Sequence, residues 1–253
     1  MTTTSALSAR RRGTFLRDTS IVFRRAMRLS LRNPVWTVMG LAQPILYLTL
    51  FGPLLEPLKA QLGGGNAYQF FVPGLLVQLG MFGALFVGFG LISEWRDGVI
   101  EAERVTPAPR SALVLGRVLR DVVVIVVQGT LLVAVAFLFG LQAPLLGIVL
   151  GILSAAMLGA AFASASYAVA LTVKSEDALA PLLNGFALPL LLLSGILLPI
   201  TSPLWLKHIV DGIRAEFLGD LGSATSLWGY GLTIALVVLG LWFGTRTFRR
   251  ENS

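Results

Sequence analysis

The residues that could do chemistry in this chain are concentrated in one charged stretch, EWRDGVIEAERVTPAPR, which runs from Glu94 to Arg110. Long apolar segments flank it on both sides. Glu94, Asp97 and Glu101 recur at intervals of three and four, so on a helix they share one face. The Thr-Pro-Ala-Pro turn at 106–109 ends such a helix. The pattern predicts a short charged helix that a partner could contact, with an ordinary solvated loop as the alternative.

Little else in the sequence supports catalysis or metal binding. There is no cysteine, so no disulfide, thiolate ligand or cysteine nucleophile is available. The one histidine, His208, has only Asp211 near it in sequence, which is a weak basis for an intramembrane enzyme. The phosphate-binding pattern G-x-x-x-x-G-K-[ST] is absent. We therefore expect no catalytic residue, no metal site and no cofactor bound by this chain.

Composition predicts a membrane protein. Hydrophobic residues make up 55% of the chain and charged residues 13%, with a mean hydropathy of +0.80, whereas about 25% of an ordinary soluble domain is charged. A helix needs about 20 apolar residues to cross a bilayer. Six segments qualify: 35–55, 70–93, 119–139, 145–173, 178–198 and 226–245. The expected fold is an all-α integral membrane protein with six transmembrane helices.

Positive charge is distributed unevenly about these spans. Seventeen of the twenty Lys and Arg residues fall on one side, and three (Lys59, Lys207 and Arg214) fall on the other. Because cationic loops remain in the cytoplasm, both termini are expected there. This topology also accounts for the net charge of +7 without a nucleic-acid partner. Arg far outnumbers Lys, as in GC-rich bacterial genomes, which hints at a bacterial plasma membrane.

The first 34 residues are expected to form a cytoplasmic tail and an amphipathic interfacial helix. Arg17, Arg24 and Arg28 fall on one side of that helix, and the opposite side carries Phe15, Val22, Ala26 and Ser30. A basic face with an apolar back lies in the headgroup plane. A solvated basic tail and a twin-arginine export signal are the alternatives. The transmembrane domain then covers residues 35–245, with the charged loop at 94–117, and residues 246–253 form a cytoplasmic tail.

The cores of the spans are expected to lack ionisable side chains, because the charges up to Arg120 are counted with the cytoplasmic end of the third span. Ion-coupled carriers usually keep an intramembrane carboxylate or histidine, so the pattern disfavours a secondary transporter. Uncharged polar residues remain in the spans, and each could contact a substrate or bond to a neighbouring helix: Gln43, Tyr47, Gln78, Gln128, Asn184 and Ser194. Pro44 kinks the first span, which makes that helix a candidate mobile wall.

Small residues recur at every fourth position of the fourth span: Gly147, Gly151, Ala155, Gly159 and Ala163. Backbones can approach closely along such a stripe. We interpret it as a packing face within the chain, with a dimer face as the alternative.

Three stretches of the sequence, 67–121, 174–200 and 208–220, resemble the membrane subunits of type-2 ATP-binding-cassette exporters. That group includes daunorubicin-resistance, antibiotic and polysaccharide export permeases. The first stretch has the Pro-Gly start of the second helix, the Glu-x-x-x-Gly-x-(Ile/Leu)-Glu loop, the Thr-Pro turn and the Gly-Arg start of the third helix. The second is similar to the second cytoplasmic loop and fifth helix of the group. The third looks like the external segment before the last helix.

The resemblance implies a homodimer of six-helix subunits in the bilayer, docked on two copies of an ABC ATPase subunit that hold ATP and magnesium. It also implies that the loop 94–104 is the coupling helix, seated in a groove of the ATPase. The coupling residues would be Glu94, Arg96, Asp97, Gly98, Glu101, Arg104 and Pro107, with Glu176 in a second, smaller contact.

The first and fifth helices would enclose the substrate path, whose polar points would be Gln43, Tyr47, Gln78, Asn184 and Ser194. Between Pro199 and His208 the chain is shorter than is common in the group, which implies an abbreviated external gate. The expected function is the permease subunit of an ATP-driven exporter, without catalysis of its own. An autonomous channel or secondary transporter is the alternative.

Overall fold

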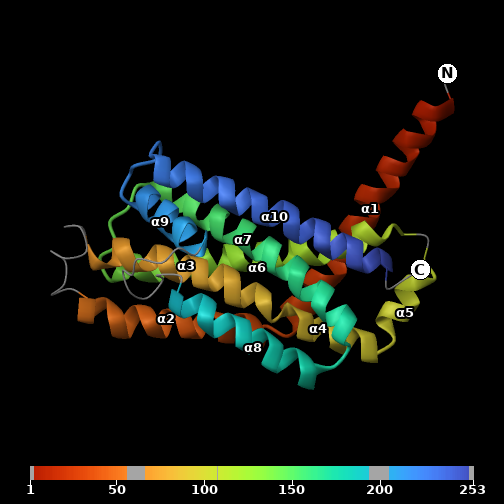
Figure 1. Cartoon of the computed structure of the whole chain (residues 1–253), viewed down its shortest axis with the longest axis horizontal. Coiled ribbons are helices and arrows are strands. Elements are labelled where there is room, and N and C mark those ends of the chain that lie inside the picture. Colours follow the sequence, from red (N-terminus) through yellow and green to blue (C-terminus); the bar gives the residue numbers. More distant parts are fainter. Residues whose placement is uncertain (1–2, 56–65, 107, 194–204, 251–253) are drawn as a thin grey trace.

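The computed structural model describes residues 3–55, 66–106, 108–193 and 205–250, and no strand occurs among them. The described helices are α1 (Thr3–Arg32), α2 (Val35–Leu55), α3 (Ala67–Leu85), α4 (Val87–Arg96), α5 (Val99–Arg104), α6 (Arg110–Leu138), α7 (Leu145–Val173), α8 (Glu176–Leu193), α9 (Trp205–Phe217) and α10 (Ala224–Arg250). The long helices lie roughly along one axis as an elongated bundle (Figure 1). The all-helical fold is therefore confirmed.

Among the described residues, five stretches are long and apolar enough to cross a membrane: Thr37–Leu54, Ala67–Arg96, Arg110–Leu138, Leu145–Val173 and Ala224–Phe248. The predicted sixth span, 178–198, is described only as far as Leu193, where α8 ends. In Figure 1, α8 runs back from the α5 end of the bundle toward α9, and α10 then returns to the α5 end. The shortened external segment, 199–208, lies outside the described residues as far as Leu204.

Helix α7 is the centre of the bundle and packs against α3, α6, α9 and α10. Its small residues allow this, because their backbones touch those of neighbouring helices. A Cβ atom on Gly147 would collide with the carbonyl group of Glu216 in α9, and one on Gly80 would collide with that of Ala155. A Cβ atom on Gly159 would collide with the side chain of Ile125 in α6. The stripe is thus a packing face within the chain, as expected.

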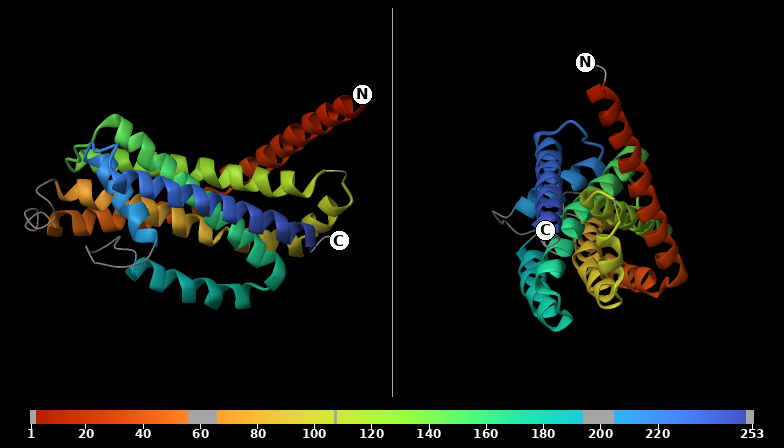
Figure 2. Two further views of the ribbon diagram at one scale, coloured as in Figure 1. Left: turned by 45° about the horizontal axis from the view of Figure 1, so that its top comes forward. Right: turned by 90° about the vertical axis from the view of Figure 1, so that its right-hand side faces the viewer.

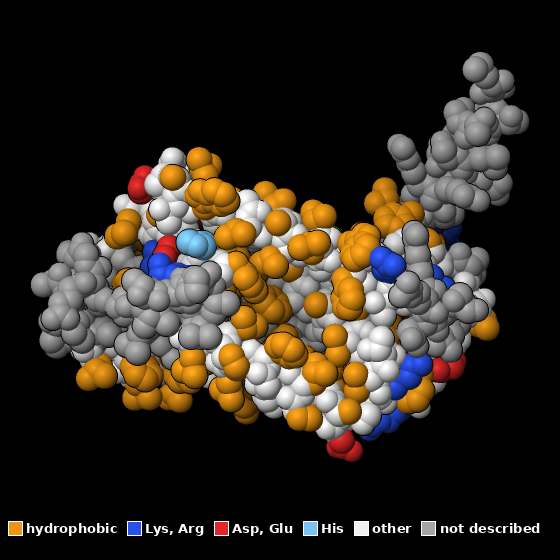
Figure 3. Space-filling view, in the orientation of Figure 1, with side chains coloured by type: hydrophobic (Ala, Val, Ile, Leu, Met, Phe, Trp, Pro, Cys, Tyr) orange, Lys and Arg blue, Asp and Glu red, His pale blue; other side chains and the backbone are white. Residues whose placement is uncertain are grey.

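The outer helices carry the apolar surface. Large exposed side chains on α2 and α10 include Val38, Met39, Leu50, Val238 and Trp242. The space-filling view shows hydrophobic side chains over the middle of the described surface and charged ones toward its two ends (Figure 3). This distribution is what a bilayer requires, because hydrocarbon cannot solvate charge.

The second predicted span is divided into α3 and α4 at Phe86. The hydroxyl of Ser166 on α7 binds two backbone groups at this break in the helix. It accepts from the backbone N–H of Gly88 at 3.1 Å and donates to the carbonyl oxygen of Leu85 at 2.5 Å. The hydroxyl therefore lets the helix bend without leaving these two backbone groups unpaired.

Helix α1 crosses the bundle obliquely, as the end-on view shows (Figure 2, right), and packs along α6. The approach requires Gly116, because a Cβ there would lie 2.7 Å from Cβ of Val22. The two predicted faces are present: Arg17, Arg24 and Arg28 are exposed, while Val22, Ala26 and Ser30 are partly buried. The apolar side, however, packs on α6, so this helix is attached to the bundle by protein contacts.

Candidate functional site

The charged stretch between α4 and α6 is two short helical pieces joined by a turn. Helix α4 ends at Arg96, and Gly98 adopts a left-handed conformation with φ of 73° before α5 begins. Glycine suits this position because other residues are strained there. The prediction that Glu94, Asp97 and Glu101 share one helical face is therefore wrong. Gly98 turns the chain after Asp97, so Glu94 and Asp97 lie at the end of α4 and Glu101 lies on α5.

The turn presents a charged tip to solvent. Arg96, Asp97 and Glu101 are exposed, whereas Ile100 is only 3% exposed and packs into the apolar core with Leu91. Ile100 thus fixes α5 to the bundle, while the acidic side chains beside it point outward. Pro107 lies outside the described residues, as does the side chain of Arg104.

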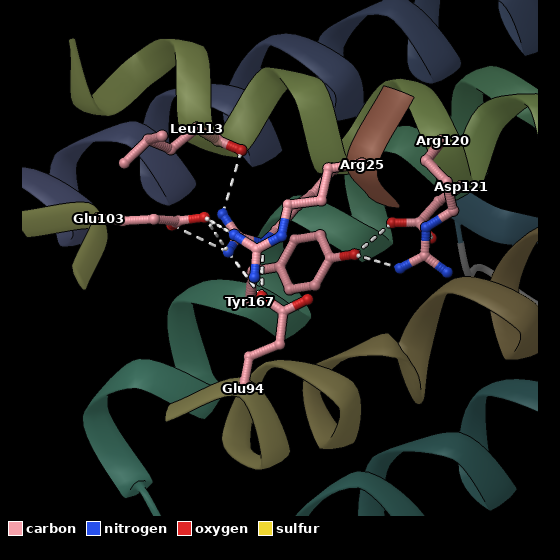
Figure 4. A network of polar contacts seen from close by, with 8 residues as sticks. Arg25, Glu94, Glu103, Leu113, Arg120, Asp121 and Tyr167 are labelled. Atoms are coloured by element: carbon pink, nitrogen blue, oxygen red, sulfur yellow. Dashed lines mark hydrogen bonds and ion pairs between the residues drawn. The ribbon is translucent and has the colours of Figure 1, made fainter. Parts of the chain in front are cut away.

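Glu94 points the other way and forms part of a buried ion cluster around Arg117 of α6 (Figure 4). The Arg117 guanidinium is 5% exposed and donates to Glu94 at 2.6 Å and to Glu103 of α5 at 3.0 Å. Glu103 also pairs with Arg25 of α1 at 3.3 Å. This cluster, hereafter the Arg117 cluster, joins α1, α4, α5 and α6.

The energies of its pairs differ greatly. Loss of one partner of a buried ion pair leaves an uncompensated charge and costs about 3–5 kcal/mol. The Arg25 side chain is 48% exposed, and a pair of that kind contributes at most about 1 kcal/mol. Arg117 therefore holds α5 against α6, and Arg25 adds little.

One turn further along α6, a second buried polar group connects α6 to α7. The Tyr167 hydroxyl donates to the Asp121 carboxylate at 2.5 Å, and Arg120 pairs with Asp121 at 3.2 Å and donates to Tyr167 at 3.3 Å. Asp121 is 4% exposed and lies within a candidate membrane span. The expectation that the cores of the spans lack ionisable side chains is therefore wrong. Folding places its partner Tyr167 beside it from 46 residues away, which no local pattern indicates.

Glu176, predicted as a second contact, lies next to this region. Its carboxylate pairs with the Arg96 guanidinium at 2.9 Å, with both side chains about half exposed, at 40% and 55%. The pair connects the end of α4 to the start of α8. Two segments predicted separately as partner contacts are thus brought together at one end of the bundle.

The predicted substrate-path residues do not form one cluster within the subunit. Gln43 donates to the Tyr47 hydroxyl at 3.1 Å on the outer side of α2, and Asn184 is exposed on α8. Gln78 is only 1% exposed, and neither atom of its amide has a partner among the described residues. Gln128 donates to the backbone of Thr37, so its role is helix packing. Ser194 lies outside the described residues.

Comparison with known proteins agrees with this architecture. Residues 17–211 match the family profile "ABC-2 type transporter". The chain is 27% identical over 241 residues to the daunorubicin resistance ABC transporter permease protein DrrB1 of Streptomyces coeruleorubidus, which covers 90% of this chain and 85% of that protein. It is 30% identical over 95 residues to the putative transport permease ycf38 of Cyanophora paradoxa, covering 37% of this chain and 33% of that protein. The chain belongs to the ABC-2 type transporter family of membrane proteins.

Proposed function

We propose that this chain is the permease subunit of an ATP-driven exporter and that the tip at 96–101 contacts a separate ATPase subunit. The family and the similarity to a protein described as a daunorubicin resistance ABC transporter permease support an ABC exporter. The observation that carries the coupling site is the arrangement around α5. An exposed acidic tip is backed by a buried apolar anchor and a buried ion cluster, which together make a rigid contact surface.

Movement of the tip passes into the bundle by three routes. Glu103 and Ile100 connect α5 to α6 and the apolar core. The Arg96–Glu176 pair connects the tip to α8, which borders the proposed substrate path. On α6, Asp121 continues the connection to Tyr167 of α7. The contacts of Glu103, Ile100 and Asp121 are mostly buried, so α5, α6 and α7 move together when the partner displaces α5, whereas the exposed Arg96–Glu176 pair is a weaker connection.

The end of the bundle that carries α5 faces the cytoplasm in this proposal. Both ends of the described chain lie toward α5 (Figure 1), and most of the cations are at that end by sequence. The functional unit is a homodimer in a bacterial plasma membrane with two ATPase copies. ATP and magnesium belong to the ATPase, and this chain has no catalytic residue.

The substrate path lies between subunits, along the outer sides of α2 and α8. Both helices expose polar side chains there, Gln43 and Tyr47 on α2 and Asn184 on α8, beside large apolar residues such as Phe186. Ser194 continues the α8 side in this proposal. Such a wall suits an amphipathic substrate, because amides bind its polar part and apolar side chains its remainder.

The alternative is an autonomous secondary transporter, and Asp121 is the observation that favours it, since buried carboxylates serve as ion relays. Asp121 already has Tyr167 and Arg120 as partners. We therefore expect export to be unchanged when the proton gradient is collapsed at constant ATP. Loss of export under that condition would favour the secondary transporter.

A copurification experiment tests the proposed partner. Tagged wild type is isolated from its native membranes, and ATPase activity is measured in the eluate. The test variant is Glu101→Arg at the tip. Its control is Asp220→Arg, which reverses an exposed acid at the opposite end. We expect ATPase activity with wild type and Asp220→Arg, and its loss with Glu101→Arg. The coupling assignment is wrong if Glu101→Arg retains the ATPase and its transport.

A further inference from the structure

Helix α9 is wedged into the end of the bundle opposite α5, against α3, α7 and α10 (Figure 1). Its backbone contacts both long neighbours directly. A Cβ on Gly147 of α7 would collide with the carbonyl group of Glu216, and one on Gly212 of α9 would lie 3.2 Å from Cα of Gly229 in α10. These close approaches enclose the last turn of α9 between α7 and α10.

A carboxyl group lies inside this contact. Glu216 is 1% exposed, and its Oε2 atom has no hydrogen-bond partner among the described residues. The hydroxyls of Ser226 and Tyr230 on α10 are also buried; neither makes a hydrogen bond of normal geometry among the described residues, although the Tyr230 hydroxyl lies close enough to Glu216 to influence its pKa. Glu216 borders a narrow void lined also by Ser154 and Thr233. The void is too small for a water molecule, so water cannot solvate a charge there.

The basic residues nearest to Glu216 in sequence make contacts with other groups. Lys207 and Arg214 both pair with Asp211, at 2.6 and 3.3 Å, and Arg214 also stacks on Phe70 of α3 at 3.6 Å. His208 is exposed. Among the residues that the structure describes, no charged group contributes to the pKa of Glu216, so the carboxyl has no counter-ion there.

The helices packed against α9 bring only one titratable group to Glu216, the Tyr230 hydroxyl of α10. Tyr68 of α3 stacks on Phe139, and Tyr167 of α7 binds Asp121. Burial raises the pKa of Glu216 from 4.5 to about 7, and the Tyr230 hydroxyl opposes that shift. A buried carboxyl without a counter-ion is stable only in its neutral form.

We propose that Glu216 is a proton-binding site whose carboxyl is protonated while α9 is packed between α7 and α10, and whose ionisation releases α9 from α10. The released end of α9 exposes Glu216 to water, where the carboxylate is solvated. This pH-dependent packing of α9 involves only residues of this chain. It depends neither on the ATPase nor on the orientation proposed above.

The sign of the pH dependence follows from the two protonation states. The packed state holds its proton up to about pH 7, and the open state loses it near pH 4.5. The packed state is therefore favoured most below pH 4.5. Opening becomes about tenfold more frequent with each pH unit between these values, and it levels off above pH 7.

Cysteine labelling tests this proposal, because the chain has no cysteine of its own. Val210→Cys places a thiol at a position of α9 that is 0% exposed, and Leu218→Cys places one just after α9 where the side chain is 62% exposed. Maleimide labelling rates are measured for both in lipid nanodiscs. The ratio of the two rates removes the pH dependence of the thiol itself. We expect this ratio to rise by at least tenfold between pH 5.5 and pH 7.5.

The same ratio in the Glu216→Gln background is expected to be independent of pH. Glu216→Met, which cannot titrate either, serves as a second variant if the glutamine protein fails to fold. Tyr230→Phe removes the hydroxyl that lowers the pKa of Glu216, so the plateau should begin at higher pH. A flat ratio in the wild-type background, or an equal rise in both Glu216 variants, overturns the proposal.

Discussion

At the α5 end of the bundle, the Arg117 guanidinium is 5% exposed and contacts two carboxylates, whereas at the α9 end the Glu216 carboxyl is 1% exposed and contacts no cation of the described part of the chain. Both groups are nearly removed from water. The first keeps its charge because its partners neutralise it, and the second is stable only while it is protonated. Similar burial therefore has different consequences: permanent pairing makes a rigid connection, and an unpaired acid makes a contact that depends on pH.

The largest loss of stability is expected when Arg117, at the centre of the ion cluster, is replaced. Arg117→Met should destabilise the protein by about 3 kcal/mol, because Glu94 loses its Arg117 partner while only 27% exposed, and Glu103 keeps only the more exposed Arg25. Denaturant unfolding in detergent measures this. Glu94→Gln in the same background should recover part of the loss. A change below about 1 kcal/mol for Arg117→Met would mean that the pairs are open to solvent.

At the α9 end, the contribution of Glu216 to the stability of the protein should depend on pH. Wild type should lose stability as pH rises from 4.5 to about 7, by up to about 3 kcal/mol, because the folded state binds the Glu216 proton more tightly than the unfolded state. Glu216→Gln should lack this component. Unfolding curves at pH 5, 6, 7 and 8 for the two proteins measure the difference, and parallel pH profiles would contradict it.

A smaller loss of stability is expected from a substitution at Gly98, in the turn between α4 and α5. Gly98→Ala should cost about 1–2 kcal/mol, because alanine is strained at a φ of 73°. Nothing lies within 4 Å of the added Cβ, so crowding makes no contribution. Gly98→Asn should cost less, since asparagine tolerates this conformation. Equal losses for both variants would point to a cause other than the backbone. Thermal unfolding distinguishes these outcomes.

The smallest change in stability is expected for the exposed ion pair at the α5 end, between Arg25 and Glu103. Arg25→Ala should change stability by less than about 1 kcal/mol, because the Arg25 side chain is 48% exposed and its pair with Glu103 is solvated. Added salt should reduce the difference further. A loss comparable with that of Arg117→Met would show that α1 is a structural part of the cluster.

The sequence was most informative about the apolar helices. The predicted spans 35–55 and 145–173 have the same bounds as α2 and α7, because long apolar runs leave few alternatives in a bilayer. The breaks at Phe86 and Gly98 were not predicted. The first depends on Ser166, which lies 81 residues after Leu85 in the sequence, and the second on a single left-handed residue.

The candidate site could be predicted only in part. The exposure of Asp97 and Glu101 agrees with the predicted contact surface, whereas Glu94 belongs to a buried cluster that includes Arg25 and Arg117. The members of this cluster come from four helices, and nothing in the local spacing relates them. Glu216 was also missed, because an acid in a short charged helix resembles a surface residue until its neighbours are known.

The proposed contact between the tip of the α4–α5 turn and an ATPase subunit can be tested by cross-linking. Asp97→Cys and Asp220→Cys place single thiols on exposed sites at opposite ends of the bundle. Native membranes carrying each variant are treated with a photoactivatable thiol-linked reagent, and the tagged chain is purified under denaturing conditions. We predict a covalent adduct with an ABC ATPase subunit from Asp97→Cys and none from Asp220→Cys. An adduct from Asp220→Cys alone, or from neither, would contradict the account.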